Sequence, residues 1–142
     1  MKKILLVLIC ICLVNVSGCT LYKELQAGIE EATIIAEEFC FALAEDDSSN
    51  AKSYLSPNYS APNKEDFEKY VAKLEEFNGI DFSNGIQIID RSDNGWSGIN
   101  GEYAYEIIFN TLIGEKEINL FFVVIKNENS YGIFSFGVNP AR

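Results

Sequence analysis

The hydrophobic pattern of the chain changes its period near Gly79, and this change restricts the fold more than any other feature of the sequence. Before Gly79, apolar residues recur at spacings of three and four, which is typical of helices with one buried side. After it, apolar and polar residues alternate, which is typical of strands with one face against a core. The order predicts an α+β domain, in which N-terminal helices pack on one face of a curved antiparallel sheet.

One long helix is predicted from Leu21 to about Glu45. Its acidic residues fall opposite an apolar stripe, and Ile34 and Phe41 lie among those acids, so either another element covers this pair or it is exposed. The polar run 45–50 ends the helix; it contains an acidic pair, Asp46-Asp47, that we interpret as a solvated helix end. The stripe consists of Leu21, Leu25, Ile29, Ala32, Ala36, Phe39 and Leu43.

Two shorter helices are predicted between this helix and Gly79. The first covers about Ala51 to Leu55 and stops at Ser56-Pro57. The second runs from Pro62 to Phe77, with Asn63 as its N-cap, and Asn78-Gly79 ends it. Its predicted buried side consists of Phe67, Tyr70, Val71, Leu74 and Phe77.

Four strands are predicted after Gly79. Turns are predicted at 92–95, 112–114 and 127–130, where Gly, Asn, Asp and Ser gather. The run 90–95 does not have the acid spacing of a calcium loop, so a β-turn explains it better. The predicted strands are Ile86–Asp90, Trp96–Thr111 (bent or bulged near Gly98 and Gly101), Glu117–Lys126 and Tyr131–Val138.

The first eighteen residues have the layout of a secretory signal. A basic start, Met1-Lys2-Lys3, precedes the apolar run Ile4–Val14. This run has eleven residues, whereas a membrane-spanning helix needs about 20. Small residues follow it and precede Cys19, whose thiol is a nucleophile that can accept a lipid.

The segment Val16-Ser17-Gly18-Cys19 resembles the lipobox of bacterial lipoproteins, with Val16 where Leu is most common. The resemblance implies that residues 1–18 are a signal peptide, that the sulfur of Cys19 carries a diacylglyceryl group, and that cleavage falls between Gly18 and Cys19, usually followed by acylation of the new amino group. Residues 19–142 then form a single domain that is lipid-anchored at the cell envelope. In a Gram-negative host, Thr20 implies the periplasmic face of the outer membrane.

Removal of residues 1–18 leaves nine basic and twenty-one acidic residues, a net charge of −12. Such a charge repels nucleic acid and anionic lipid headgroups, so no nucleic-acid partner is expected, while a basic protein partner is compatible with it. Helical periodicity begins within a few residues of Cys19, so we expect the domain close to the membrane. Cys40 is then the only unmodified cysteine, and we expect it to be a buried structural thiol.

The element order resembles the nuclear transport factor 2-like superfamily, also called cystatin-like in fold. The resemblance rests on the end of the long helix (42–47), the segment 51–57 and the closing strand 131–139. It implies a curved sheet wrapped around the first helix, with a conical pocket between them. Some members are isomerases or dehydratases that use Asp, Tyr or His, and others only bind, so the fold does not choose between these roles.

The chain contains no His, the commonest general base near neutral pH and the commonest metal ligand. We therefore predict no metal site, no cofactor and no catalytic residue. In the second predicted strand, alternation places Tyr103 and Tyr105 on one face. If the domain has a pocket, these two tyrosines are expected to line it, with Tyr54 or Trp96 at its mouth.

Three functional hypotheses follow from these observations. The leading one is a non-catalytic envelope lipoprotein that binds a basic protein partner or a hydrophobic small ligand. The second is a pocket enzyme of the isomerase or dehydratase type, which needs a carboxylate beside a pocket tyrosine. The third is an acidic inhibitor or immunity protein that neutralises a basic toxin or hydrolase, and the net charge motivates it.

Overall fold

A computed structural model describes residues 2–58, 66–97, 102–127 and 130–140, with the backbone alone from 2 to 21. Helices come first and strands follow, so the predicted α+β class with a four-stranded antiparallel sheet is confirmed. The elements are α1 (Lys2–Ala44), α2 (Ser48–Ser53), α3 (Phe67–Asn78), the 3-10 helix η2 (Phe82–Asn84), β1 (Ile86–Ser97), β2 (Tyr103–Ile113), β3 (Lys116–Asn127) and β4 (Ser130–Pro140).

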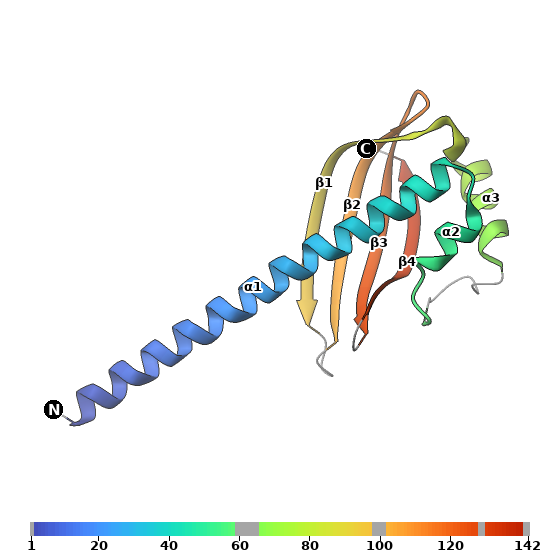
Figure 1. The fold of residues 1–142 in the computed structure, drawn as a ribbon. Helices are drawn as coiled ribbons and strands as arrows, with labels where there is room; N and C mark the ends of the chain where they lie inside the picture. Colours follow the sequence, from blue (N-terminus) through green and yellow to red (C-terminus); the bar gives the residue numbers. More distant parts are fainter. Residues whose placement is uncertain (1, 59–65, 98–101, 128–129, 141–142) are drawn as a thin grey trace.

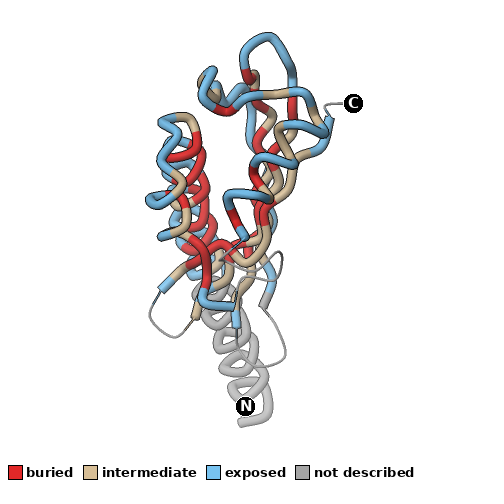
Figure 2. Tube along the Cα trace, turned by 90° about the vertical axis from the view of Figure 1, so that its right-hand side faces the viewer, coloured by how far each residue is buried: buried red, intermediate tan, exposed pale blue. Residues whose placement is uncertain are grey.

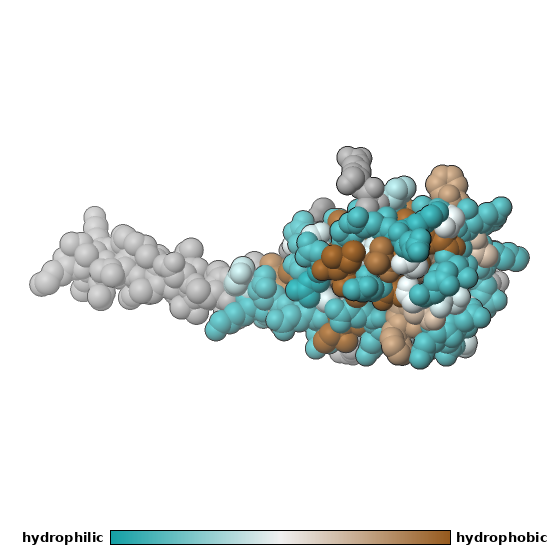
Figure 3. Space-filling view, turned by 90° about the horizontal axis from the view of Figure 1, so that it is seen from above, coloured by the Kyte–Doolittle hydropathy of each residue, from teal (hydrophilic) through white to brown (hydrophobic). Residues whose placement is uncertain are grey.

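The four strands form a meander in the order β1-β2-β3-β4, and α1 crosses one face of the sheet diagonally (Figure 1). The buried parts of α1 and of the sheet face each other, and exposed residues lie on the outer sides (Figure 2). Seen from above, hydrophilic side chains cover most of the domain, and apolar side chains gather in the middle of this view (Figure 3). The core is therefore a layer between α1 and the sheet, to which α2, α3 and η2 also contribute buried residues.

Helix α1 begins earlier than predicted, at Lys2 instead of Leu21, and ends at Ala44 as expected. It projects well beyond the sheet on its N-terminal side (Figure 1). Side chains 22–27 are mostly exposed, and the first buried position is Gly28. At about 1.5 Å per residue, Cys19 lies roughly 13 Å along the helix from Gly28. Residues 19–27 therefore form a helical stalk that leads from Cys19 to the packed part of the domain.

The predicted apolar stripe of α1 forms the centre of the core. Ile29, Ala32, Ala36, Phe39 and Leu43 are all buried. The ring of Phe39 meets three other rings edge-on, with centroid distances of 5.0–5.8 Å. Each such pair adds about 0.5–1.5 kcal/mol to the free energy of apolar burial. The three partner rings belong to Phe67 in α3, Phe122 in β3 and Phe136 in β4.

Helix α3 begins at Phe67, later than the predicted Pro62, and the predicted N-cap Asn63 lies outside the described residues. Gly79 ends the helix in a left-handed conformation, as expected. The prediction that Phe77 is buried is wrong, because 88% of this side chain is exposed. Ten residues of helix rotate Phe77 roughly 80° away from Phe67, beyond the side that packs on the core.

The predicted turn at 92–95 is wrong, because these residues lie inside β1. The register pairs Gly95 with Tyr105 and Trp96 with Ala104, so the strand predicted over Trp96–Thr111 is divided between β1 and β2. β1 is an edge strand, so its turn-forming residues disturb pairing on one side only. Glycine also suits position 95 because the Cβ of any other residue would lie only 3.2 Å from the Tyr105 ring, which is a tight contact.

The bulge in β1 lies at 88–90, and a second irregularity in the β3–β4 pairing lies beside Val123 and Val124. The bulge predicted near Gly98 and Gly101 lies outside the described residues. In β2 and β3, buried residues alternate with half-buried ones, so one sheet face packs on α1. The buried set is Tyr105, Ile107, Phe109, Thr111, Ile113, Ile118, Leu120, Phe122 and Val124.

Candidate functional site: an acidic cleft

A cleft of about 400 Å³ lies where the end of α1, α2, α3 and η2 meet. Leu43, Val71 and Phe82 supply its apolar part, and these three side chains also belong to the core. Two serines and an alanine contribute as well. Five carboxylates complete the lining: Asp46, Asp47, Glu68, Glu75 and Asp81.

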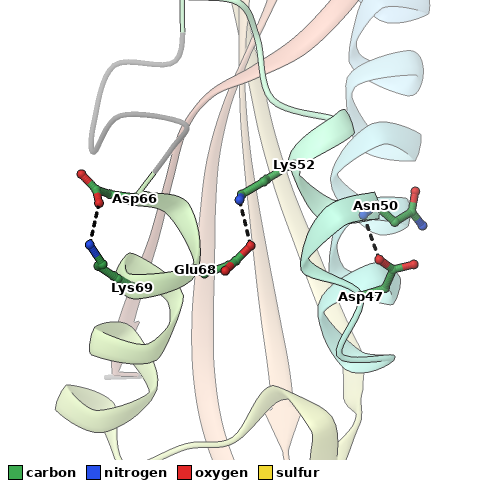
Figure 4. Close-up of polar contacts among 6 residues, drawn as sticks. All are labelled: Asp47, Asn50, Lys52, Asp66, Glu68 and Lys69. Atoms are coloured by element: carbon green, nitrogen blue, oxygen red, sulfur yellow. Dashed lines mark hydrogen bonds and ion pairs between the residues drawn. The ribbon is translucent and has the colours of Figure 1, made fainter.

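The end of α1 positions the first two carboxylates. The N–H groups of Asp46 and Asp47 donate to the carbonyls of Leu43 (3.1 Å) and Ala42 (3.0 Å), which is the paired pattern of a Schellman motif. Asp46 has a φ of 56°, where glycine is commonest, but aspartate tolerates this conformation. The Asp47 carboxylate accepts from the N–H of Asn50 at 2.9 Å and thereby caps α2 (Figure 4).

Two further carboxylates accept hydrogen bonds from η2, and one of them, Glu75, thereby connects η2 to α3. Glu75 accepts from the N–H of Phe82 at 2.9 Å. Asp81 caps η2 by accepting from the N–H (2.9 Å) and the hydroxyl (2.6 Å) of Ser83. These bonds fix where the two carboxylates lie at the cleft.

Glu68 of α3 forms an ion pair with Lys52 of α2 at 2.8 Å, so the pair connects the two short helices (Figure 4). The hydrogen bond and the charge of Lys52 lower the pKa of Glu68. Both groups are solvent-accessible, so the pair contributes little to stability. Asp66 and Lys69 form a second exposed pair at 3.1 Å in the first turn of α3 (Figure 4).

Five carboxylates therefore line the cleft, and one of them, Glu68, is paired with Lys52. Within the described residues, no group of three or more His, Cys, Asp or Glu side chains could hold a metal ion. The carboxylates are distributed around an apolar floor. Such a lining suits a Lys or Arg side chain, whose aliphatic stem can lie on apolar atoms while its charged end meets carboxylates.

The structure brings together Tyr103 and Tyr105, two of the four predicted pocket residues. Tyr105 is buried, and its ring lies 6.5 Å from Tyr103 and 5.9 Å from Tyr131, centroid to centroid. Burial, with a smaller effect of Tyr131, raises the pKa of Tyr105 to about 12. These rings form one end of the core and do not line the cleft.

The other two predicted pocket residues lie elsewhere. Trp96 is exposed on the edge strand β1, opposite Ala104. Tyr54 caps the end of α2 and is half-buried. Desolvation, followed by the charge of Glu38 and a hydrogen bond to it, raises the pKa of Tyr54. Neither side chain lines the cleft.

The buried polar side chains of the described residues are those of Thr33, Ser56 and Thr111, so no Asp or Glu is buried there. Cys40 is buried, as predicted, and desolvation, with a smaller effect of Glu37, raises the pKa of its thiol. The sequence reveals only part of the cleft, the adjacent pair Asp46-Asp47. Glu68, Glu75 and Asp81 join them through tertiary packing alone.

Gly18 and Cys19, the predicted cleavage and lipidation sites, lie within α1, where the backbone alone is described. Among the described residues, no helix combines the length and the apolar character that crossing a membrane requires. No protein-family model matches this chain, and a search of curated proteins also finds no match.

Proposed function

We propose that the protein is a lipid-anchored envelope protein that binds a basic protein partner without catalysing a reaction. The observation that carries this proposal is the acidic cleft, with its five carboxylates around an apolar floor. A Lys or Arg side chain of the partner enters the cleft, and its charge is neutralised there. The net charge of the domain attracts such a partner over a longer range and accelerates association.

The cleft favours a cationic partner over a hydrophobic small ligand. Pockets for small molecules are mostly apolar with a few polar groups, whereas carboxylates dominate this rim.

An inhibitor or immunity protein that neutralises a basic toxin or hydrolase is one form of the proposed function. The second hypothesis, a pocket enzyme, receives no support from the described residues, because none of their carboxylates is buried beside a tyrosine.

The anchor is proposed from the lipobox-like segment and from the stalk formed by α1. In the mature protein, Cys19 would carry the lipid at the end of a helix that rises roughly 13 Å before it meets the domain. This distance exceeds the Debye length of about 8 Å at physiological salt. The net charge of the domain alone predicts repulsion between the domain and anionic headgroups. The stalk reduces this repulsion because it holds the domain away from them.

We also infer that the fold is of the nuclear transport factor 2-like type. The long helix α1 across a four-stranded antiparallel meander supports this inference. The space that holds a conical pocket in that superfamily contains packed rings here, including Phe39, Phe122 and Phe136. In this chain the cleft at the helix ends offers the space for binding instead.

The cleft is tested by removing one charge without disturbing the backbone. Asp46→Asn suits this purpose, because asparagine also tolerates the left-handed conformation. A hexa-arginine peptide should bind the full-length protein at low salt, and Asp46→Asn should weaken binding roughly two- to fivefold. Glu115→Gln, the same change of charge in the exposed β2–β3 turn, is the matched control. Equal weakening by both variants would show that only the net charge matters, and the cleft proposal would be abandoned.

The anchor is tested by Cys19→Ser. The natural chain should sediment with membranes and yield a lipidated N-terminal peptide in mass spectrometry. The variant should lose the lipid and leave the membrane fraction. An unmodified Cys19 in the mature natural protein, or a mature chain that starts elsewhere, would rule the anchor out and leave the cleft unaffected.

A further inference from the structure

The solvent-facing side of α1 carries an exposed apolar pair. From the sequence alone, this pair could have been either covered by another element or exposed. Ile34 is 48% exposed and Phe41 is 65% exposed. They are seven residues apart, so they lie on one line along the helix, roughly 10 Å from each other. Isolated exposed apolar residues are ordinary on protein surfaces, so the pair gains meaning only from its surroundings.

Glutamates surround this pair on both sides. In an α-helix, positions three and four residues away are the surface neighbours. For Ile34 all four of these positions are Glu, and for Phe41 three of the four are Glu. One flank has Glu30 and Glu37, and the other has Glu31, Glu38 and Glu45, so two acidic rows enclose one apolar row.

These glutamates remain largely without cationic neighbours. The ion pairs among the described residues connect Lys52 with Glu68, Lys69 with Asp66, and Arg91 with Asp93, so none uses a glutamate of this surface. All five side chains are exposed. Like charges in these positions repel one another. A cationic partner that binds here would relieve this repulsion.

We propose that this surface, the α1 ridge (Glu30, Glu31, Ile34, Glu37, Glu38, Phe41 and Glu45), docks a basic amphipathic helix of a partner protein. The partner helix would place apolar side chains seven residues apart on Ile34 and Phe41, and Lys or Arg side chains on both flanks. An apolar centre inside a polar ring is the usual arrangement of an interaction hot spot. The charge complementarity selects a basic helix over a second copy of this acidic chain.

The inference rests on the proposed function only in taking the partner to be a basic protein. The α1 ridge shares no residue with the lining of the acidic cleft. A partner can therefore use one surface, the other or both, and the two proposals can fail separately.

The test uses the full-length protein and a synthetic helical peptide as the probe. The peptide carries Leu at two positions seven apart, with Lys three and four residues away from each Leu. A second peptide has Ser in place of both Leu, at the same charge. We expect the Leu peptide to bind at least about tenfold more tightly than the Ser peptide, and its affinity to fall as salt rises.

Two variants of the protein locate the binding. Phe41→Ser should weaken the Leu peptide about tenfold or more, as the loss of a hot-spot residue does. Phe77→Ser is the matched control, because it removes an exposed phenylalanine from α3. Equal affinity for the Leu and Ser peptides, or equal binding to both variants, would overturn the proposal.

Asp46→Asn separates this site from the acidic cleft. It should weaken the hexa-arginine peptide and leave the affinity for the Leu peptide nearly unchanged, whereas Phe41→Ser should do the reverse. If Asp46→Asn alone weakens both peptides, the Leu peptide binds in the cleft and the α1 ridge is excluded.

Discussion

The two sides of α1 differ sharply, although they belong to one helix. The side that faces the sheet carries small residues such as Ala32 and Ala36 beside the ring of Phe39, all fully buried. The other side carries Ile34 and Phe41 among exposed glutamates. The first side holds the domain together, and the second is free to bind. Phe39 and Phe41 are only two positions apart, yet one is buried and the other is exposed. The apolar character of a helix residue therefore does not reveal whether it belongs to the core or to a surface.

The largest expected effect is that of Phe39→Ala. This change removes the ring that contacts three other core rings and leaves a cavity, so the free energy of unfolding should fall by about 3–5 kcal/mol. Urea unfolding followed by circular dichroism measures it. Phe41→Ala, on the exposed side, should change stability by no more than about 0.5 kcal/mol. Similar losses from both would mean that the two sides do not differ in this way.

Gly28→Ala tests how closely α1 approaches the sheet. In an exposed helix this change stabilises by about 1 kcal/mol, but here the new Cβ would overlap the ring and hydroxyl of buried Tyr105. We expect a net loss of about 1–3 kcal/mol in unfolding free energy. In a Tyr105→Leu background the same change should be harmless, which a double-mutant cycle detects. Ala27→Gly, at the exposed neighbouring position, should cost about 1 kcal/mol through helix propensity alone.

The buried end of Tyr105 also predicts a pH dependence. Because the pKa of Tyr105 is raised to about 12 in the folded state, its neutral form is favoured there. The resulting stability is fully present below the ordinary tyrosine pKa of about 10 and is lost as pH rises through 12. Urea midpoints compared at pH 8 and pH 11 should therefore fall less for Tyr105→Phe than for the natural chain. An equal fall would contradict the assigned burial of this hydroxyl.

The smallest effect is expected from a single charge on the exposed side. Glu37→Gln removes one of the like charges of the α1 ridge and should raise the unfolding free energy by a few tenths of a kcal/mol at low salt. The gain should disappear in high salt, where surface charges are screened. A loss of stability instead would show that Glu37 makes a contact that holds the fold.

Much of the fold follows from local patterns. The end of α1, the end of α3 at Gly79, the inward stripe of α1, the order of the strands and the burial of Cys40 all agree with the sequence analysis. Each depends on a period or a capping signal within a short segment. The prediction of a turn at 92–95 is wrong because these residues suit a turn as well as they suit an edge strand. Only the pairing with β2 places them in a strand.

The candidate site was less predictable. Asp46 and Asp47 are adjacent and mark a helix end, but nothing local connects them with Glu68, Glu75 and Asp81. These five meet because α3 packs on the core through Phe67 and Val71, and η2 folds back through Phe82. A side chain's own neighbours in the sequence carry no information about such an encounter.

The sequence by itself determined that helices precede strands, the charge, the absence of His and the buried side of α1, because periodicity and composition act within single segments. Tertiary structure alone decided which residues surround the acidic cleft, that Phe77 faces solvent, and that Ile34 and Phe41 stay uncovered. The physical reason is that exposure depends on what packs against a residue. For Ile34 and Phe41, the packing of the described elements leaves much of each side chain exposed.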